Sequence, residues 1–205
     1  TIASALSIGS GASVGPEDPS VQIGANIGSM VGQKLRLSDD TIRTLVAAGA
    51  AAGIAAAFNA PIAGVFFALE VILGQIGANT MGAIVISAVS SAVITQAISG
   101  SQPAFIVPKY AFNSAWELPL YFGLGLLAGP LAAIYVRLVY TAQDLFRNWN
   151  FPNWLKPAAG GVAIGFIGLF LPQIFGVGYE TIEQILAGEN LGVLLLTALI
   201  LGKLI

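Results

Sequence analysis

Residues 48–70 read AGAAAGIAAAFNAPIAGVFFALE, and this stretch decides the class of fold that the chain can adopt. It belongs to a run of 26 consecutive uncharged residues between Arg43 and Glu70. A transmembrane helix needs about 20 mostly apolar residues, so this run is long enough to cross a bilayer. Phe58-Asn59-Ala60-Pro61 interrupts the run, and Pro61 suits the first position of a new helix.

The rest of the chain has the same character. Uncharged runs of 38, 19 and 23 residues follow, between Glu70 and Lys109, Glu117 and Arg137, and Lys156 and Glu180. Of the 205 residues, 56% are hydrophobic and 9% are charged, whereas a soluble domain carries about 25% charged residues. We therefore expect an all-α, multi-pass integral membrane protein, located in the cell membrane.

Composition also excludes several kinds of function. The chain has no His and no Cys, which excludes zinc sites, thiolate nucleophiles, disulfides and Ser-His triads. Asp18 has no second intramembrane Asp, and Lys203 lies near the chain end, so an intramembrane hydrolase is not favoured. Eight basic residues and a net charge of −2 make a nucleic-acid partner improbable. We expect no catalytic residues, no metal and no cofactor.

Helix signals along the chain predict several segments too short to span a membrane. The expected helices cover residues 1–9, 20–31, 41–57, 61–73, 80–98, 118–146 with a kink at Pro130, 157–170, 178–187 and 191–204. Short hydrophobic segments interrupted by Gly or Pro are typical of broken helices that meet around a polar ligand within the membrane. Small residues at spacing four indicate close helix packing, at Gly24, Gly28 and Gly32, Gly49 and Gly53, Gly125 and Gly129, and Gly161 and Gly165.

Residues 9–20, GSGASVGPEDPS, are the candidate site because they open a helix between two apolar segments. The first amides of a helix have no intrahelical partner and stand at its positive end, so they can bind an anion without a cationic side chain. The Glu17 carboxylate can occupy the place of that anion, which would make it a gate released by protonation. Alternatively, Glu17 and Asp18 are first-turn acids that stabilise a helix start at the membrane surface.

Residues 15–24, GPEDPSVQIG, resemble the Gly-basic-Glu-Gly-Pro signature of the CLC family of chloride channels and chloride/proton exchangers. Residues 48–70 are similar to that family's Gly-Ala-Ala-Ala-Gly, Phe-Asn-Ala-Pro-Leu-Ala-Gly and Glu run. The resemblance implies an inverted-repeat homodimer in lipid that moves chloride or another small monovalent anion. Residues 1–205 would form a single partial transmembrane domain, truncated at both ends. The resemblance makes Glu17 the gating glutamate and places the anion-binding loop at Gly15, Pro16, Glu17, Asp18 and Pro19.

Two positions depart from the signature: Pro16 replaces the basic residue and Asp18 replaces Gly, which leaves the identity of the anion open. The proton pathway of the family is implied at Glu70 and Val71, but Val71 stands where many exchangers have a second acid. Neighbouring side chains on a helix point about 100° apart, so Glu70 is not an equivalent substitute. We therefore predict channel-like or weakly proton-coupled transport. The alternatives are an obligate chloride/proton antiporter that uses Glu70, and a non-transporting scaffold derived from the family.

Overall fold

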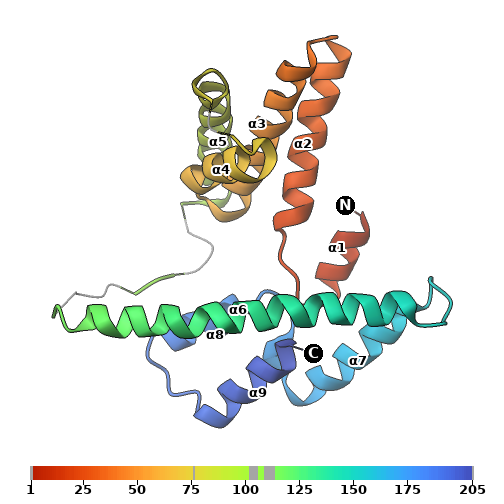
Figure 1. The fold of residues 1–205 in the computed structure, drawn as a ribbon, viewed down its shortest axis with the longest axis vertical. Coiled ribbons are helices and arrows are strands. Elements are labelled where there is room, and N and C mark those ends of the chain that lie inside the picture. The colour runs from red at the N-terminus through yellow and green to blue at the C-terminus, as the bar shows by residue number, and fades with distance from the viewer. Residues whose placement is uncertain (1, 76, 102–105, 109–113, 205) are drawn as a thin grey trace. The chain divides into compact units, whose positions relative to one another are not determined.

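The computed structural model describes residues 2–75, 77–101, 106–108 and 114–204. The chain divides into two compact units, Thr1–Ile106 and Val107–Ile205. All regular structure in the described residues is helical, as the sequence predicts (Figure 1). The expectation that the whole chain is one partial transmembrane domain stays a prediction.

Unit 1 contains the candidate site. Its elements are α1 (Ile2–Gly9), α2 (Glu17–Lys34), α3 (Asp39–Phe58), α4 (Pro61–Phe67), the π-helix η1 (Ala68–Leu73) and α5 (Ala78–Ser99). With 18 residues, α2 is longer than the predicted segment 20–31. The difference arises because Pro19 lies in the first helical turn, where its missing N–H removes no hydrogen bond.

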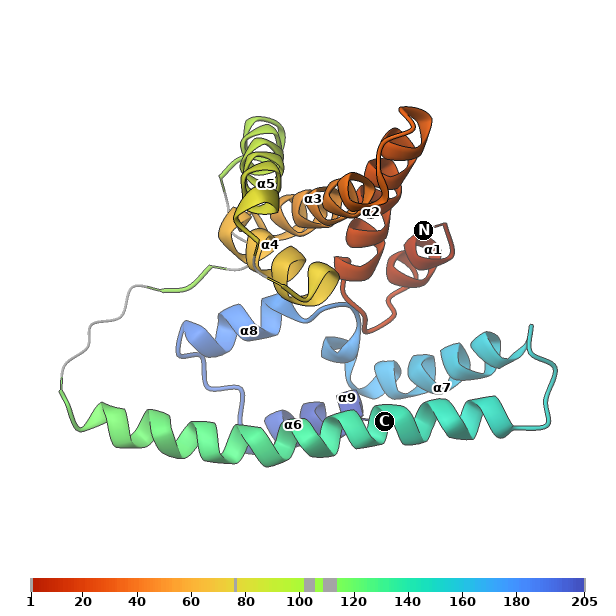
Figure 2. The ribbon, with the colours of Figure 1, turned by 45° about the horizontal axis from the view of Figure 1, so that its top comes forward.

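Helices α2 and α3 lie side by side at very close range (Figure 2). A Cβ atom added at Gly24 would overlap the backbone of Gly49, and one added at Gly49 would overlap the backbone of Gly24. The same close approach joins Gly28 to Leu45 and Gly53 to Ser20, so the helices run antiparallel. The predicted glycine packing is confirmed for these two helices.

The other predicted glycine ridges have a different environment. A Cβ atom at Gly125, Gly129, Gly161 or Gly165 would meet nothing within 4 Å in the described part of the chain. Spacing alone therefore does not distinguish a glycine that contacts a helix from one that faces open space.

The core of unit 1 is rich in alanine and surrounds α3. Buried side chains come from α3, α4, η1 and α5: Ala47, Ala48, Ala51, Ala55, Val65, Ala68, Leu69, Ile84, Ala88 and Ala92. Helix α5 is tied to α3 by Ser87 Oγ, which donates to the Ala48 carbonyl at 2.9 Å, and by Ser91 Oγ, which donates to the Ala52 carbonyl at 2.8 Å. Small side chains on α3 thus bring three neighbouring elements close to one backbone.

Unit 2 consists of α6 (Glu117–Asn148), α7 (Lys156–Phe170), the 3₁₀ turn η2 (Pro172–Ile174), α8 (Tyr179–Leu186) and α9 (Val193–Leu204). Helix α6 continues past Pro130 as one element (Figure 1). The Lys156 amino group donates to the Arg147 carbonyl at 3.2 Å, which closes the turn between α6 and α7. The Phe175 ring occupies the space beside Gly168, so η2 folds back onto α7.

In the described part of the chain, three helices are long and apolar enough to cross a membrane: Asp39–Phe58, Thr80–Ser99 and Glu117–Asn148. Pro61–Leu73, Lys156–Phe170 and Val193–Lys203 are apolar but shorter. Helix α6 has no buried residue within the chain, as expected for an apolar helix surrounded by lipid or by further protein. The combination of long and short apolar helices agrees with the sequence prediction.

Candidate functional site: the loop that opens helix α2

The loop between α1 and α2 begins with a helix end that glycine makes possible. Gly11 has φ +96°, a left-handed conformation that side chains other than glycine rarely adopt. Its amide donates to the Ile8 carbonyl at 3.0 Å, and the Ala12 amide donates to the Ser7 carbonyl at 3.1 Å. This pair of bonds is a Schellman motif, which satisfies the last carbonyls of α1 and turns the chain toward α2.

The start of α2 is held by Ser20 rather than by a capping side chain. Pro16 stands at the N-cap position with φ −81° and offers no side-chain cap. Its carbonyl accepts two bonds from Ser20, one from the amide at 3.1 Å and one from Oγ at 2.7 Å. Because Ser20 also contacts Gly53, the first turn of α2 is fixed to the last turns of α3.

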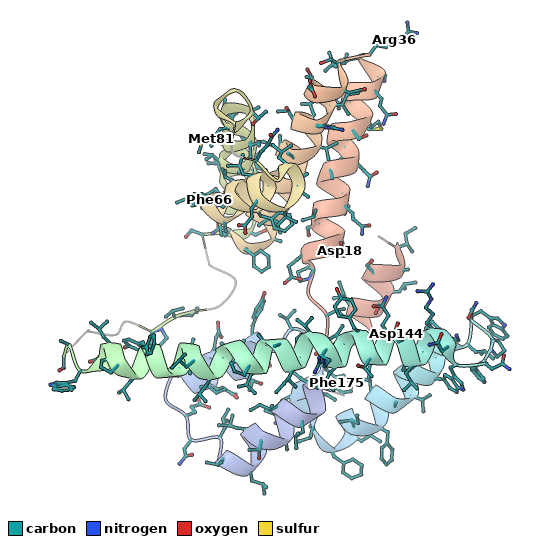
Figure 3. The ribbon with its side chains drawn as sticks, in the orientation of Figure 1. Asp18, Arg36, Phe66, Met81, Asp144 and Phe175 are labelled. Carbon is teal, nitrogen blue, oxygen red and sulfur yellow. The ribbon has the colours of Figure 1, made fainter. Side chains whose placement is uncertain are left out.

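The adjacent acids Glu17 and Asp18 have different environments. Asp18 is exposed at the start of α2 (Figure 3), and its Oδ2 accepts a 2.7 Å hydrogen bond from Gln22 Nε2, one turn along the helix. Glu17 is half-buried, and its carboxylate lies back over the Cα of Gly15. Among the described residues, no hydrogen bond holds the Glu17 carboxylate in this position. Asp18 is therefore tied to its own helix, whereas the Glu17 carboxylate is not.

The backbone limits which residues of the loop can bind an anion. Pro16 and Pro19 have no amide hydrogen, so they shape the loop but cannot donate. The amides of Glu17 and Asp18 stand in the first turn, where a helix supplies no carbonyl partner. These amides and that of Gly15 are thus the donors that the predicted anion-binding loop can offer. The Glu17 carboxylate lies against the same loop, over Gly15.

The second predicted site residue, Glu70, lies on the π-helix η1. Its neighbour Val71 is 62% exposed, and Glu70 is exposed as well. Short π-helical turns are frequent at functional sites. A π-helix also makes a wider turn than an α-helix, so neighbouring side chains diverge by less than 100°. The reduction is small, so the side chains at positions 70 and 71 still point in different directions, as the sequence argument assumed.

Glu17 and Glu70 lie toward opposite ends of α3. Ser20, three residues after Glu17, contacts Gly53 near the end of α3. Ile72 and Leu73, just after Glu70, line a cavity of about 270 Å³ together with Ile42, Arg43 and Val46 at the start of α3. At 1.5 Å per residue, these contact points are about 10 to 16 Å apart along the helix axis. The two acids are not brought together into one site.

Three contacts that support the site were not predicted from the sequence, although Gly15 itself was named as part of the anion-binding loop. Gln22 bonds Asp18, Ser20 closes the first turn of α2, and Gly15 makes room for Glu17. The spacing of four between Asp18 and Gln22 is a signal that could have revealed the first contact. The other two depend on the conformation of the loop.

Helices long and apolar enough to cross a membrane, together with shorter apolar helices, define an integral membrane protein. A sequence model of the voltage gated chloride channel family matches residues 1–205. The chain belongs to this family, which confirms the resemblance found in its two motifs.

Relatives of known name give the same assignment. The chain is 34% identical over 205 residues to an H(+)/Cl(−) exchange transporter ClcA of Vibrio parahaemolyticus, covering 97% of this chain and 44% of the relative. It is 37% identical over 198 residues to chloride channel protein CLC-e of Arabidopsis thaliana, covering 91% of this chain and 28% of the relative. The chain thus spans less than half the length of either protein.

A solved structure is similar over nearly the whole chain. It is described as a slow cyanobacterial Cl−/H+ antiporter, with a TM-score of 0.78 and 26% identity, covering 97% of this chain and 48% of that one. The similarity confirms the all-helical CLC-type fold. The channel-like part of the sequence prediction receives no support from an antiporter.

Proposed function

We propose that the full-length protein moves small monovalent anions, chloride first among them, across a membrane, and that Glu17 gates the pathway. The observation that carries the proposal is the half-buried Glu17 carboxylate, which lies in the loop at the start of α2 without a hydrogen bond from any described residue. Helix-start amides favour a negative charge, either that carboxylate or a permeant anion. Protonation of Glu17 would remove the competing charge and open the site.

The structure also bears on the alternative that Glu17 and Asp18 only stabilise the start of a helix. Asp18 fits the description of a first-turn acid that stabilises a helix, because it is exposed and bonded to Gln22. Glu17 does not fit it equally well, since its carboxylate is half-buried and lies back over Gly15. A carboxylate that lies in the loop, and not along its own helix, suits a gate, so transport is the better-supported proposal.

The test is anion flux from the full-length protein in liposomes, measured against external pH. In Glu17→Gln the side chain is permanently neutral, and flux is expected to become nearly independent of pH. Asp39→Asn is the matched control, because Asp39 is an exposed acid at the first position of α3. Retention of the parent's pH dependence in Glu17→Gln would remove Glu17 from the gating role.

For the mode of transport, proton-coupled exchange with Glu70 as the inner titratable group is the candidate that the named antiporter and exchanger favour. The position of Glu70 on a π-helix, toward the opposite end of α3 from Glu17, supports it. Exchange needs a titratable group at each end of a proton path, and the contacts of the two acids' neighbours lie toward opposite ends of α3. Channel-like transport, predicted from Val71, is the rival.

A chloride gradient imposed on proteoliposomes, with internal pH recorded, separates the two modes. Uphill proton movement at a fixed stoichiometry is expected for exchange, and its loss in Glu70→Gln would assign the inner step to Glu70. Val71→Glu is the complementary variant, since it places a carboxyl at the position where many exchangers carry one. Chloride movement in the parent without any uphill proton movement would establish the channel-like mode.

The proposed partners, besides the anion, are lipid and a second copy of the protein. Helices α4 and α5 present an apolar groove of about 210 Å³, lined by Pro61, Ile62, Val65, Phe66, Met81, Val85 and Val89. Such a surface suits either lipid or protein within a membrane. Cross-linking of Cys introduced at Ile62, in a chain that has no native Cys, would test the homodimer.

A further inference from the structure

Gly15 occupies the position where a side chain would meet the proposed gate. A Cβ atom built on Gly15 would overlap the Glu17 carboxylate, with Oε2 as the nearest atom and Oε1 and Cδ also in collision. The Glu17 carboxylate therefore fills the space that any other residue at position 15 would use for its own side chain. The carboxylate can lie there because Gly15 has no side chain.

This collision differs in kind from those at four other tightly packed glycines of unit 1. At Gly24, Gly28, Gly49 and Gly53 an added Cβ would overlap the backbone of a neighbouring helix, which can yield only if the helices separate. At Gly15 all three atoms in collision belong to the end of one flexible side chain. An alanine there would displace the carboxylate and leave the backbone in place.

We propose that Gly15 is a positioning residue of the gate: its missing side chain provides the closed position of the Glu17 carboxylate. The inference rests on the proposed function of Glu17 and adds a second determinant to it. Glu17 supplies the charge, and Gly15 supplies the place where that charge rests. A residue with a Cβ at position 15 removes this place without changing any titratable group.

The expected effect has a definite sign. In the proposed mechanism the deprotonated carboxylate closes the site and protonation opens it. A methyl group at position 15 destabilises the closed, deprotonated state relative to the open one, so less acid is needed for opening. The pH of half-maximal flux should therefore rise, by at least about one unit for a tenfold change in the ratio of closed to open states.

The experiment compares pH profiles of chloride flux from full-length protein in liposomes for the parent, Gly15→Ala and Gly9→Ala. Gly9 is the matched control, because it ends α1 a few residues upstream and a Cβ there would meet nothing within 4 Å. Gly15→Ala should raise the midpoint by about one pH unit or more, and Gly9→Ala should leave it in place. The thermal midpoint of Gly15→Ala should equal that of the parent.

A second pair of variants tests whether Gly15 acts through the carboxylate. In a Glu17→Ala background there is no carboxylate to displace, so adding Gly15→Ala should leave the pH dependence of flux unchanged. An unshifted profile in Gly15→Ala, an undiminished effect in the Glu17→Ala background or a failure of Gly15→Ala to fold would each overturn the inference. Failure of the proposed function is a separate result: Glu17→Gln would then keep the parent's pH dependence.

Discussion

Replacing Gly24 by Ala should destabilise the protein because the methyl group has no room between α2 and α3. The added Cβ would overlap the Gly49 carbonyl oxygen and lie 2.7 Å from its carbon. Alanine is better than glycine inside a helix by about 1 kcal/mol, which offsets part of the loss. Overpacking typically costs about 1 to 3 kcal/mol, and here both colliding groups belong to backbones that cannot rotate away.

The matched control is Gly82→Ala. Gly82 lies within α5, and a Cβ there would meet nothing within 4 Å, so this variant gains the helix preference without the collision. The stability difference between the two variants should therefore be about 1 to 3 kcal/mol, with Gly24→Ala the less stable. Reversible unfolding of the full-length protein in a fixed detergent, followed by helix content, measures that difference.

Equal stability of Gly24→Ala and Gly82→Ala would refute the close approach of α2 and α3. A smaller loss, accompanied by altered anion flux, would show instead that α2 shifts as a body. Such a shift would also move Glu17, since the first turn of α2 contacts α3 through Ser20 and Gly53.

Two further predictions follow from the site and its supports. Sulfate flux should be far below chloride flux, because neutral amide dipoles stabilise one charge at short range but do not offset the dehydration of a divalent ion; comparable fluxes in liposomes would contradict an amide-built site. The double variant Ser87→Ala/Ser91→Ala should lower the free energy of unfolding by about 1 kcal/mol, roughly 0.6 for each lost hydrogen bond. Ser90→Ala, on the exposed face of α5, should leave it unchanged. Equal stability of the double variant and Ser90→Ala, measured by unfolding in detergent, would show that these bonds contribute nothing.

The helices could be predicted because their signals are local. Pro61 begins α4 as its fixed φ predicts, and Asn59 ends α3 in the left-handed conformation, which Asn tolerates better than most residues. The start of α2 was placed too late, since Pro19 looks like a break until its place in the first turn is known. The π-helix at Glu70 gave no sequence signal, because no composition distinguishes it from an α-helix.

The site could be predicted in its charges but not in its geometry. Residue identities place two acids at a helix start, and they cannot say that Asp18 bonds Gln22 while Glu17 lies back over Gly15. That difference depends on the path of the loop, which the Schellman end of α1 at Gly11 and the two bonds from Ser20 to Pro16 determine. These are contacts between residues several positions apart, and single-residue preferences do not encode them.

Helix α3 packs against both the helix that carries Glu17 and the helix that leads to Glu70, and its small residues allow this close packing. The α2 backbone approaches α3 at Gly49 and Gly53, and Gly64 of α4 approaches it at Ala51. Larger side chains on these faces of α3 would push away the element that carries Glu17 or the one that leads to Glu70. The Ala- and Gly-rich run that indicates a membrane helix is thus also what holds the two acids at a fixed separation. A substitution such as Gly53→Ala should accordingly disturb gating at Glu17 although residue 53 bears no charge and binds no anion.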